Sequence, residues 1–232
     1  MSKAAIKDNL AFVREQLSQA ATEAGRSPEE IQLIAVSKTK PTAMINEAVL
    51  ANHSVFGENV VQEAIKKMSA LNNNDNIEWH MIGHLQKNKV KFCPGNFQWI
   101  HSIDSIELAK KLEEHCALKQ QNINVLIQVN LSQEKSKFGV QQLGELFQLA
   151  ETLHAGHWIK LRGLMTIPEP DLGEASTRKI FEKLRMWRDQ LQKELGAPEI
   201  NELSMGMTAD FQWAIQEGAT MIRLGTAIFG PR

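Results

Sequence analysis

The chain of 232 residues contains no tyrosine, so no phenolic side chain can donate or accept a proton in it. Its two cysteines, Cys93 and Cys116, have no C-x-x-C partners, which excludes a disulfide framework and a cysteine-based zinc or redox motif. The longest apolar runs, such as IQLIAV, fall far short of the roughly 18 residues that suggest a membrane span. The N-terminal residues MSKAAIKDNL are polar and charged where a secretory signal needs an apolar core. We therefore expect a soluble, cytoplasmic protein.

Neither sign of charge is in excess. The 26 basic and 27 acidic side chains give a formal net charge of −1. No basic footprint for a phosphate backbone is indicated, so we expect neither a nucleic-acid nor a membrane partner. No Ser/Gly-rich linker and no block of like charges divides the chain, and we expect one domain over residues 1–232.

Apolar periodicity predicts an alternation of strands and helices. Short apolar runs predict eight strands, at residues 31–37, 55–56, 78–82, 98–103, 124–130, 159–165, 202–205 and 221–224. Helical spacing predicts one helix before the first strand, at 2–24, and seven between strands, at 42–51, 60–71, 85–90, 106–118, 143–153, 175–195 and 211–217.

This alternation predicts an α/β fold with parallel strands joined by helical crossovers. Eight strands in a chain of this length predict a single (β/α)₈ TIM barrel. Because only seven crossover helices are predicted, we expect the N-terminal helix to pack where an eighth would lie. A doubly wound open sheet is the alternative, but its first strand should run into a Gly-rich turn, and here it runs into SKTKP.

In such barrels the chemistry lies at the C-terminal ends of the strands. Lys38 follows the first strand, where an ammonium beside an apolar wall and other cations loses part of its affinity for a proton and can attack an aldehyde. The alternative is a lysine that caps the strand and reaches solvent. Lys40 is the competing nucleophile, but Pro41 places it at a helix entrance, where we expect it to be exposed.

Turns after the last two strands could hold a phosphate. Gly225 and Thr226 follow the eighth strand, and Ser204 and Gly206 come at the end of the seventh. Backbone N–H groups and hydroxyls in such turns bind phosphate, and a site of this kind recurs in barrels. Ordinary turn glycines are the alternative. The combination with Lys38 across the barrel opening, and with Arg223 between them, is more specific than either signal alone.

Seven blocks of the sequence carry a family resemblance: AVSKTKP (35–41), FGENVVQE (56–63), WHMIGHLQKNK (79–89), IQVNLSQEKSKFG (127–139), RGLMTIP (162–168), LSMGMTAD (203–210) and IRLGTAIFG (222–230). In them the chain resembles, nearly end to end, the pyridoxal-phosphate homeostasis protein family, single-barrel relatives of the N-terminal domain of alanine racemase. One departure is visible, because the family often has tyrosine where Val60 stands.

The resemblance implies a cofactor, pyridoxal 5′-phosphate (PLP), held by Lys38 as an internal aldimine, and no metal. It implies that Arg223 faces the pyridine nitrogen and that Asn59 lines the ring pocket, with Met205 or Ile82 as ring neighbours. It further implies that the phosphate is gripped by four residues: Ser204, Gly206, Gly225 and Thr226. Lys137 could add positive charge near the phenolic oxygen, although a solvated loop lysine is an equal alternative.

Arginine only donates hydrogen bonds, and beside the pyridine nitrogen it disfavours the protonated ring that stabilises carbanions. Alanine racemases pair their lysine with a tyrosine from the partner's C-terminal domain, and this chain offers neither that domain nor a tyrosine. We therefore expect a monomeric, non-catalytic PLP-binding protein that stores, buffers or delivers the cofactor and so affects amino-acid and 2-oxo-acid balance. PLP-dependent apoenzymes and small amines are its candidate partners. The alternative is a slow PLP-dependent amino-acid racemase, with His84, His101 or Asp104 as the second base.

Overall fold

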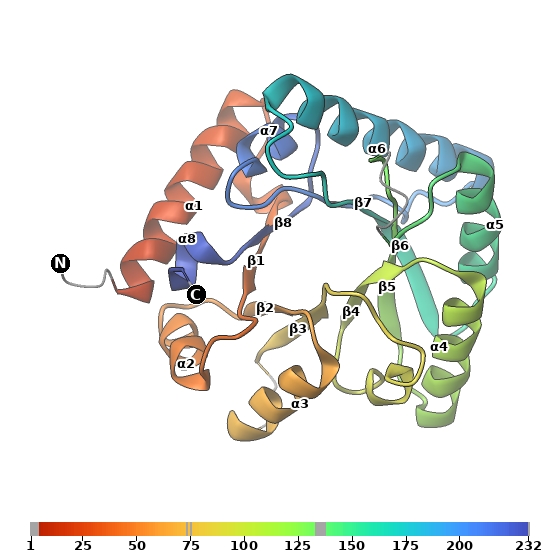
Figure 1. Cartoon of the computed structure of the whole chain (residues 1–232), viewed down its shortest axis with the longest axis horizontal. Helices are drawn as coiled ribbons and strands as arrows, with labels where there is room; N and C mark the ends of the chain where they lie inside the picture. Colours follow the sequence, from red (N-terminus) through yellow and green to blue (C-terminus); the bar gives the residue numbers. More distant parts are fainter. Residues whose placement is uncertain (1–4, 73, 75, 133–137, 232) are drawn as a thin grey trace.

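The residues that the computed structural model describes, 5–72, 74, 76–132 and 138–231, form a closed barrel of eight parallel strands (Figure 1). Each strand pairs with the next in the chain, and the first pairs with the last, so the predicted TIM barrel is confirmed. The strands are β1 (Gln32–Val36), β2 (Val55–Glu58), β3 (Glu78–Met81), β4 (Trp99–Ile103), β5 (Ile123–Gln128), β6 (Ile159–Met165), β7 (Glu202–Ser204) and β8 (Met221–Leu224).

Helices surround this barrel. The described residues form α1 (Ile6–Glu23), α2 (Thr42–Leu50), α3 (Val61–Ala70), α4 (Ile106–Lys119), α5 (Leu143–His154), α6 (Glu174–Leu195), α7 (Phe211–Gln216) and α8 (Thr226–Phe229), with short 3₁₀ helices η1 (Pro28–Glu30) and η2 (Val90–Phe92). Across these residues no helix is both long and apolar enough to cross a membrane.

One predicted helix, at 85–90, is wrong. Residues 83–89 form a loop with turns that ends in η2. Leu85 and Val90 are both fully buried, but they stand five positions apart, which does not place them on one helical face. They hold the loop against the core from its two ends. The loop lies against Asn59, the residue that follows β2.

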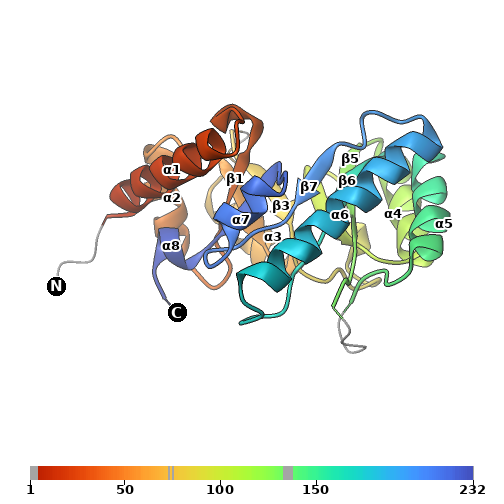
Figure 2. The ribbon, with the colours of Figure 1, turned by 90° about the horizontal axis from the view of Figure 1, so that it is seen from above.

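The N-terminal helix packs where the eighth crossover helix would lie, as predicted. Helix α1 buries Leu10, Val13 and Leu17, and it lies alongside α7, α8 and α2 (Figure 1). The amide of Asn9 donates to the carbonyl of Ile228 in α8 at 2.8 Å. The helix ends at Glu23 and is followed by Gly25, whose φ of +67° favours glycine. Residues 2–4 of the predicted helix lie outside the described residues. Figure 2 shows α1 and α8 at one end of the molecule and α4 and α5 at the other.

The barrel wall has two different sides. Alternate strand residues such as Leu33 and Ala35 face outward and join a large hydrophobic cluster between strands and helices. The inward side holds a small separate cluster of four buried residues, Ile34, Leu126, Met165 and Met221. The interior also holds four buried polar side chains: His80, His101, Ser204 and Arg223. The inside of the barrel is therefore partly polar, and not filled by apolar side chains alone.

Candidate cofactor-binding site

Lys38 lies in a turn that directly follows β1. The N–H of Lys40 donates to the carbonyl of Ser37 at 3.0 Å, so Lys38 is the second residue of a four-residue turn. The Ser37 hydroxyl points outward, where it donates to Oε1 of Glu58 at 2.6 Å. Ile34, in β1, belongs to the cluster on the inner side of the barrel, and Lys38 follows four residues later, just past the end of the same strand. Lys38 is half-buried, at the barrel opening.

The turns after β7 and β8 meet beside this lysine. A Cβ atom built on Gly225 would lie 3.4 Å from the carbonyl oxygen of Val36, two residues before Lys38. The hydroxyls of Thr226 and Thr208 are 3.2 Å apart and link the two turns. We call residues 206–208 and 225–226 the paired turns. Lys38 and these turns were predicted to face one another across the opening, and the structure brings them to adjacent strand ends.

Gly206 allows the first of these turns to form. Its φ is +95°, a conformation that side chains rarely adopt, and a Cβ there would lie 2.7 Å from the Cβ of Ala214. Its carbonyl accepts the N–H of Arg223 at 2.9 Å, which joins the turn to β8. Any residue other than glycine would push this turn away from α7.

Arg223 lies below the paired turns, inside the barrel. It is only 4% exposed, and its guanidinium donates to the Ser204 hydroxyl at 2.5 Å and to the carbonyl of Thr166 at 2.9 Å. Desolvation lowers the pKa of Arg223 to about 10, partly offset by the charge of Asp210. The side chain therefore remains a cation at neutral pH. It is a fixed, buried donor group between the opening and the core.

Ser204, predicted to grip the phosphate, lies below the paired turns. Its side chain is fully buried, and its hydroxyl is bonded to Arg223 and, at 2.9 Å, to Nδ1 of His101. Both of these partners lie in the barrel interior. The hydroxyl that the turn does present is that of Thr208, which is exposed. Our reading of the sequence missed Thr208, although it stands in the block LSMGMTAD.

Ile82 and Asn59 flank the opening on the other side. A Cβ on Gly57 would lie 2.9 Å from side-chain atoms of both Ile34 and Ile82, so Ile82 points inward over the core of the barrel. Met205 differs: it is fully buried in the outer hydrophobic cluster, behind the barrel wall. Met205 therefore does not line the opening, whereas Ile82 and Asn59 line a cavity beside it.

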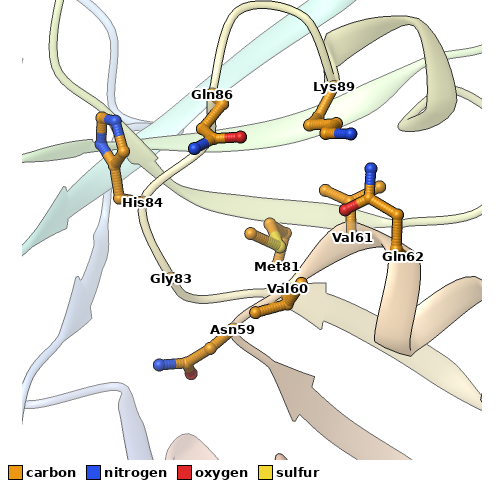
Figure 3. Close-up of a pocket in the computed structure, with 9 residues that line it drawn as sticks. All are labelled: Asn59, Val60, Val61, Gln62, Met81, Gly83, His84, Gln86 and Lys89. Carbon is orange, nitrogen blue, oxygen red and sulfur yellow. The ribbon is translucent and has the colours of Figure 1, made fainter.

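Two cavities adjoin Asn59. One, of about 370 Å³, lies between the 83–89 loop and the start of α3 (Figure 3), and it is lined by Asn59, Val60, Val61, Gln62, Met81, Gly83, His84, Gln86 and Lys89. In Figure 3 the side chains of Gln62 and Lys89 point toward one another, and that of Asn59 points away from them. The second, of about 400 Å³, is lined by Asn59, Ile82, Gly83, His84, Gln128, Val129, Asn130, Phe138 and Ile167.

The loop between these cavities touches β2 closely. A Cβ on Gly83 would lie 2.3 Å from the carbonyl oxygen of Asn59, so only glycine fits there. Next to it, the His84 ring stacks on Phe138 with centroids 3.6 Å apart, and Nδ1 of His84 is 3.7 Å from Asp104. Desolvation raises the pKa of Asp104, and the charge of His84 opposes this. Both groups lie at the rim of the opening.

The other candidate groups lie elsewhere. His101 is fully buried in the barrel interior, where desolvation lowers its pKa well below the usual value, so it does not face the opening as a base. Lys40 is not an exposed lysine as predicted: its ammonium donates to the carbonyls of Phe229, Gly230 and Pro231 at 3.3, 2.9 and 2.8 Å. Lys137 lies outside the described residues.

Known proteins share the fold and much of the sequence of this chain. The family model for the alanine racemase N-terminal domain matches residues 2–232. The pyridoxal phosphate homeostasis protein of Escherichia coli K12 is 43% identical over 229 residues, which is 98% of this chain and 97% of that protein. This chain belongs to the pyridoxal phosphate homeostasis protein family. The member from Pseudomonas aeruginosa is 42% identical and covers 98% of this chain and 96% of its own length.

Solved structures are also similar to this chain. PipY of Synechococcus elongatus, solved with PLP bound, superposes with a TM-score of 0.87 at 37% identity, covering 97% of this chain and all of PipY. Alanine racemase from Clostridium difficile, in complex with cycloserine, superposes with a TM-score of 0.74 at 16% identity. It shows a shared barrel fold only, and the match covers 60% of that enzyme.

Proposed function

We propose that this protein binds PLP at the barrel opening and stores, buffers or delivers it without a dedicated turnover reaction. The observation that carries the proposal is the placement of Lys38 at the end of β1, beside the paired turns of β7 and β8 and above the buried Arg223. The relatives named pyridoxal phosphate homeostasis protein, and PipY with its bound PLP, support the same assignment.

The residues of the opening fit this cofactor. Thr208 and Thr226 come from two different strand ends, both are exposed, and their oxygens are 3.2 Å apart, close enough for one phosphate to contact both. Gly206 and Gly225 let the two turns pack closely against α7 and the end of β1, because a Cβ on Gly206 would meet Ala214 and one on Gly225 would meet Val36. The four residues of the paired turns that we assign to the phosphate are Gly206, Thr208, Gly225 and Thr226.

Three further side chains complete the proposed site. Bound PLP would supply an aldehyde that condenses with primary amines, and we assign that amine to Lys38, in the turn that follows β1. Arg223 presents donors to the ring nitrogen and has no proton acceptor of its own, so it leaves that nitrogen unprotonated. Asn59 and Ile82 border the ring from the β2 and β3 side.

Arg223 also bears on turnover. An unprotonated ring is a weak electron sink, which disfavours racemisation, transamination and decarboxylation. A two-base racemase would need a second proton-transfer group at the opening. The chain has no tyrosine, and His101 is hydrogen-bonded to His80 and Ser204 in the interior. His84 and Asp104, at the rim, therefore remain as candidates for the second base of a racemase. Conversion of an L-amino acid to its enantiomer at about 1 s⁻¹ or faster would support the racemase.

The binding proposal is tested by reductive trapping. Protein mixed with PLP and reduced with borohydride should carry the pyridoxyl mass on the peptide that contains Lys38. Lys38→Ala should lose that adduct and most of the visible absorption, whereas Lys66→Ala, an exposed lysine on α3, should keep both. An adduct that persists unchanged in Lys38→Ala would move the attachment to another lysine, first to Lys40 or Lys137, and would overturn the assignment.

Delivery and assembly are separate parts of the proposal. Small amines and PLP-dependent apoenzymes are the proposed acceptors of PLP from the exposed paired turns. A loss of PLP absorbance from the protein on adding either acceptor would measure the transfer. We propose a monomer, and light scattering measures this directly.

A further inference from the structure

A buried charged cluster lies behind Lys38, on the outer side of the barrel wall, where no cofactor would touch it. The ammonium of Lys67, on α3, is 2.7 Å from each of three oxygens: the carbonyl of Ser37, Oε1 of Glu58 and Oε1 of Glu63. An ammonium has three N–H donors, so all three are used. Lys67 is 7% exposed and Glu58 is fully buried.

Such a cluster is an inefficient source of stability. Removing charges from water costs free energy that an ion pair only partly recovers, and an apolar replacement is often as stable. Desolvation raises the pKa of Glu58 despite the hydrogen bonds from Lys67 and Ser37. Desolvation also acts to raise the pKa of Glu63, but hydrogen bonds from Lys67 and Thr39 outweigh it, and the net shift is downward. In the part of the chain that the structure describes, the other oxygen of Glu58 is buried without a hydrogen-bond partner.

The contacts of this cluster fall on both sides of Lys38. Before it, Ser37 is held twice, through its carbonyl by Lys67 and through its hydroxyl by Glu58 at 2.6 Å. After it, the N–H of Thr39 donates to Oε1 of Glu63 at 2.6 Å. The two glutamates are in turn bonded to the one ammonium. Lys67 thus ties together the main chain on either side of the proposed cofactor lysine.

The turn that carries Lys38 needs to be held. Thr39 has a φ of +63°, the left-handed conformation that the third residue of a type II turn requires and that glycine normally supplies. A β-branched residue there is strained and persists only when its surroundings fix it. The hydrogen bond from Thr39 to Glu63, backed by Lys67, is such a constraint.

We propose that Lys67 is a positioning residue for Lys38: through Ser37, Glu58 and Glu63 it fixes the strained turn that presents the Lys38 amine at the barrel opening. This inference rests on the proposed function, because it assumes that Lys38 is the attachment point. Lys67 itself touches no part of the opening and acts only through the main chain. Glu58 and Glu63 belong to the segment FGENVVQE that also carries Asn59, so one stretch of chain lines the ring site and fixes the lysine.

The first test compares Lys67→Met with Lys66→Met, the same substitution at the neighbouring exposed position of α3. The rate of borohydride trapping of PLP on the Lys38 peptide should fall by roughly tenfold or more in Lys67→Met, since small misplacements of a reacting group cost one to two orders of magnitude. Lys66→Met should trap at the wild-type rate. A folded Lys67→Met that traps Lys38 as fast as the wild type overturns the inference.

The second test does not depend on the buried lysine tolerating replacement. Glu63 is 29% exposed at its side chain, so Glu63→Ala should fold, yet it removes the acceptor of the Thr39 N–H. It should slow trapping and speed hydrogen exchange at the Thr39 amide, whereas Glu63→Gln, which keeps a carbonyl oxygen there, should restore both. Wild-type exchange and trapping in Glu63→Ala would contradict the inference. Failure of the wild type itself to trap PLP on Lys38 would instead refute the proposed function.

Discussion

Nδ1 of His101 lies 2.9 Å from the hydroxyl oxygen of Ser204, inside the barrel and below its opening. Arg223 donates to the same hydroxyl, so the Ser204 proton goes to His101. The imidazole of His101 is therefore assigned its proton on Nε2, which donates to Nδ1 of His80 at 2.9 Å. Nε2 of His80 in turn donates to Glu78 at 2.7 Å. In this series every hydrogen bond from Ser204 onward is donated toward Glu78.

This series of hydrogen bonds joins the buried cation of Arg223 to the distant carboxylate of Glu78. Both imidazoles are neutral, since desolvation lowers the pKa of His80 and that of His101. Glu78 stands at the first position of β3, where its side chain is 35% exposed, at the opposite end of the barrel from the opening. The polar interior therefore helps to hold Arg223 in place, together with the carbonyl of Thr166.

Ser204→Ala should destabilise the protein by about 2–6 kcal/mol. It leaves Nδ1 of His101 and one N–H of Arg223 buried without their partner, and each such loss costs about 1–3 kcal/mol. Urea denaturation at neutral pH measures the change in the free energy of unfolding. Ser69→Ala, at an exposed position of α3, is the matched control and should change it by less than about 0.5 kcal/mol. An equally small loss in Ser204→Ala would show that the link is not maintained.

Gly206→Ala should weaken both folding and PLP binding. The new Cβ would lie 2.7 Å from the Cβ of Ala214 and 3.0 Å from the Cα of Phe211, at a φ of +95°. We expect a loss of about 1–3 kcal/mol in the free energy of unfolding and a weaker affinity for PLP, measured by absorbance titration. Gly144→Ala, in the first turn of α5 with open space around it, should instead be neutral or slightly stabilising. Unchanged PLP affinity in Gly206→Ala would remove this turn from the proposed site.

The barrel was predictable because its signals are local and repeated. Runs such as 159–165 and 221–224 match β6 and β8 at both ends, and the count of eight strands against seven crossovers placed α1 correctly. The prediction failed where the signal is short. Helix α8 has four residues, too few for a period, and the loop that contains Leu85 was read as a helix from apolar residues that anchor it.

The site divides in the same way. Lys38, Gly206 and Thr226 come together because all follow strands of one barrel, and strand order alone predicts that. A local sequence pattern does not show how far along the barrel axis a side chain lies. Ser204 was therefore assigned to the opening, although it lies below the opening. Met205 directly follows Ser204, and neighbouring side chains of a strand point to opposite faces. Met205 therefore lies on the outer side of the barrel wall and not at the opening. The cluster around Lys67 was missed because its partners come from β1, β2 and α3.

Both cysteines should be unreactive in the folded protein. Burial raises the pKa of the Cys93 thiol to about 12 and that of Cys116 to about 12, and neither side chain is exposed. Since the thiolate is the reactive form, modification by a disulfide reagent near pH 8 should be slower than in unfolded protein by about 10²-fold or more. The absorbance of the released thiol measures the rate, and denatured protein provides the reference of two thiols per chain. Rapid labelling of native protein would show that one of these sites opens.

Stability should fall as the solution is acidified, and His53 should account for part of the fall. Its ring is 6% exposed, and its Nε2 donates to the carbonyl of Val55 at 2.8 Å. Desolvation lowers the pKa of His53 to about 4, with a contribution from the charge of Arg14 and against the effect of the Val55 hydrogen bond. The unfolded chain, with a histidine pKa of about 6.5, then binds more protons than the folded chain between about pH 6.5 and about pH 4.

Because protonation favours the unfolded state in that interval, the free energy of unfolding should decline by up to about 3 kcal/mol from His53 alone between those limits. The buried His80 and His101 act with the same sign. His53→Gln keeps an amide donor for Val55 but cannot titrate, so its stability should decline less steeply. Urea denaturation across this pH range measures both slopes, and identical slopes for His53→Gln and the wild type would show that His53 accepts a proton without unfolding the chain.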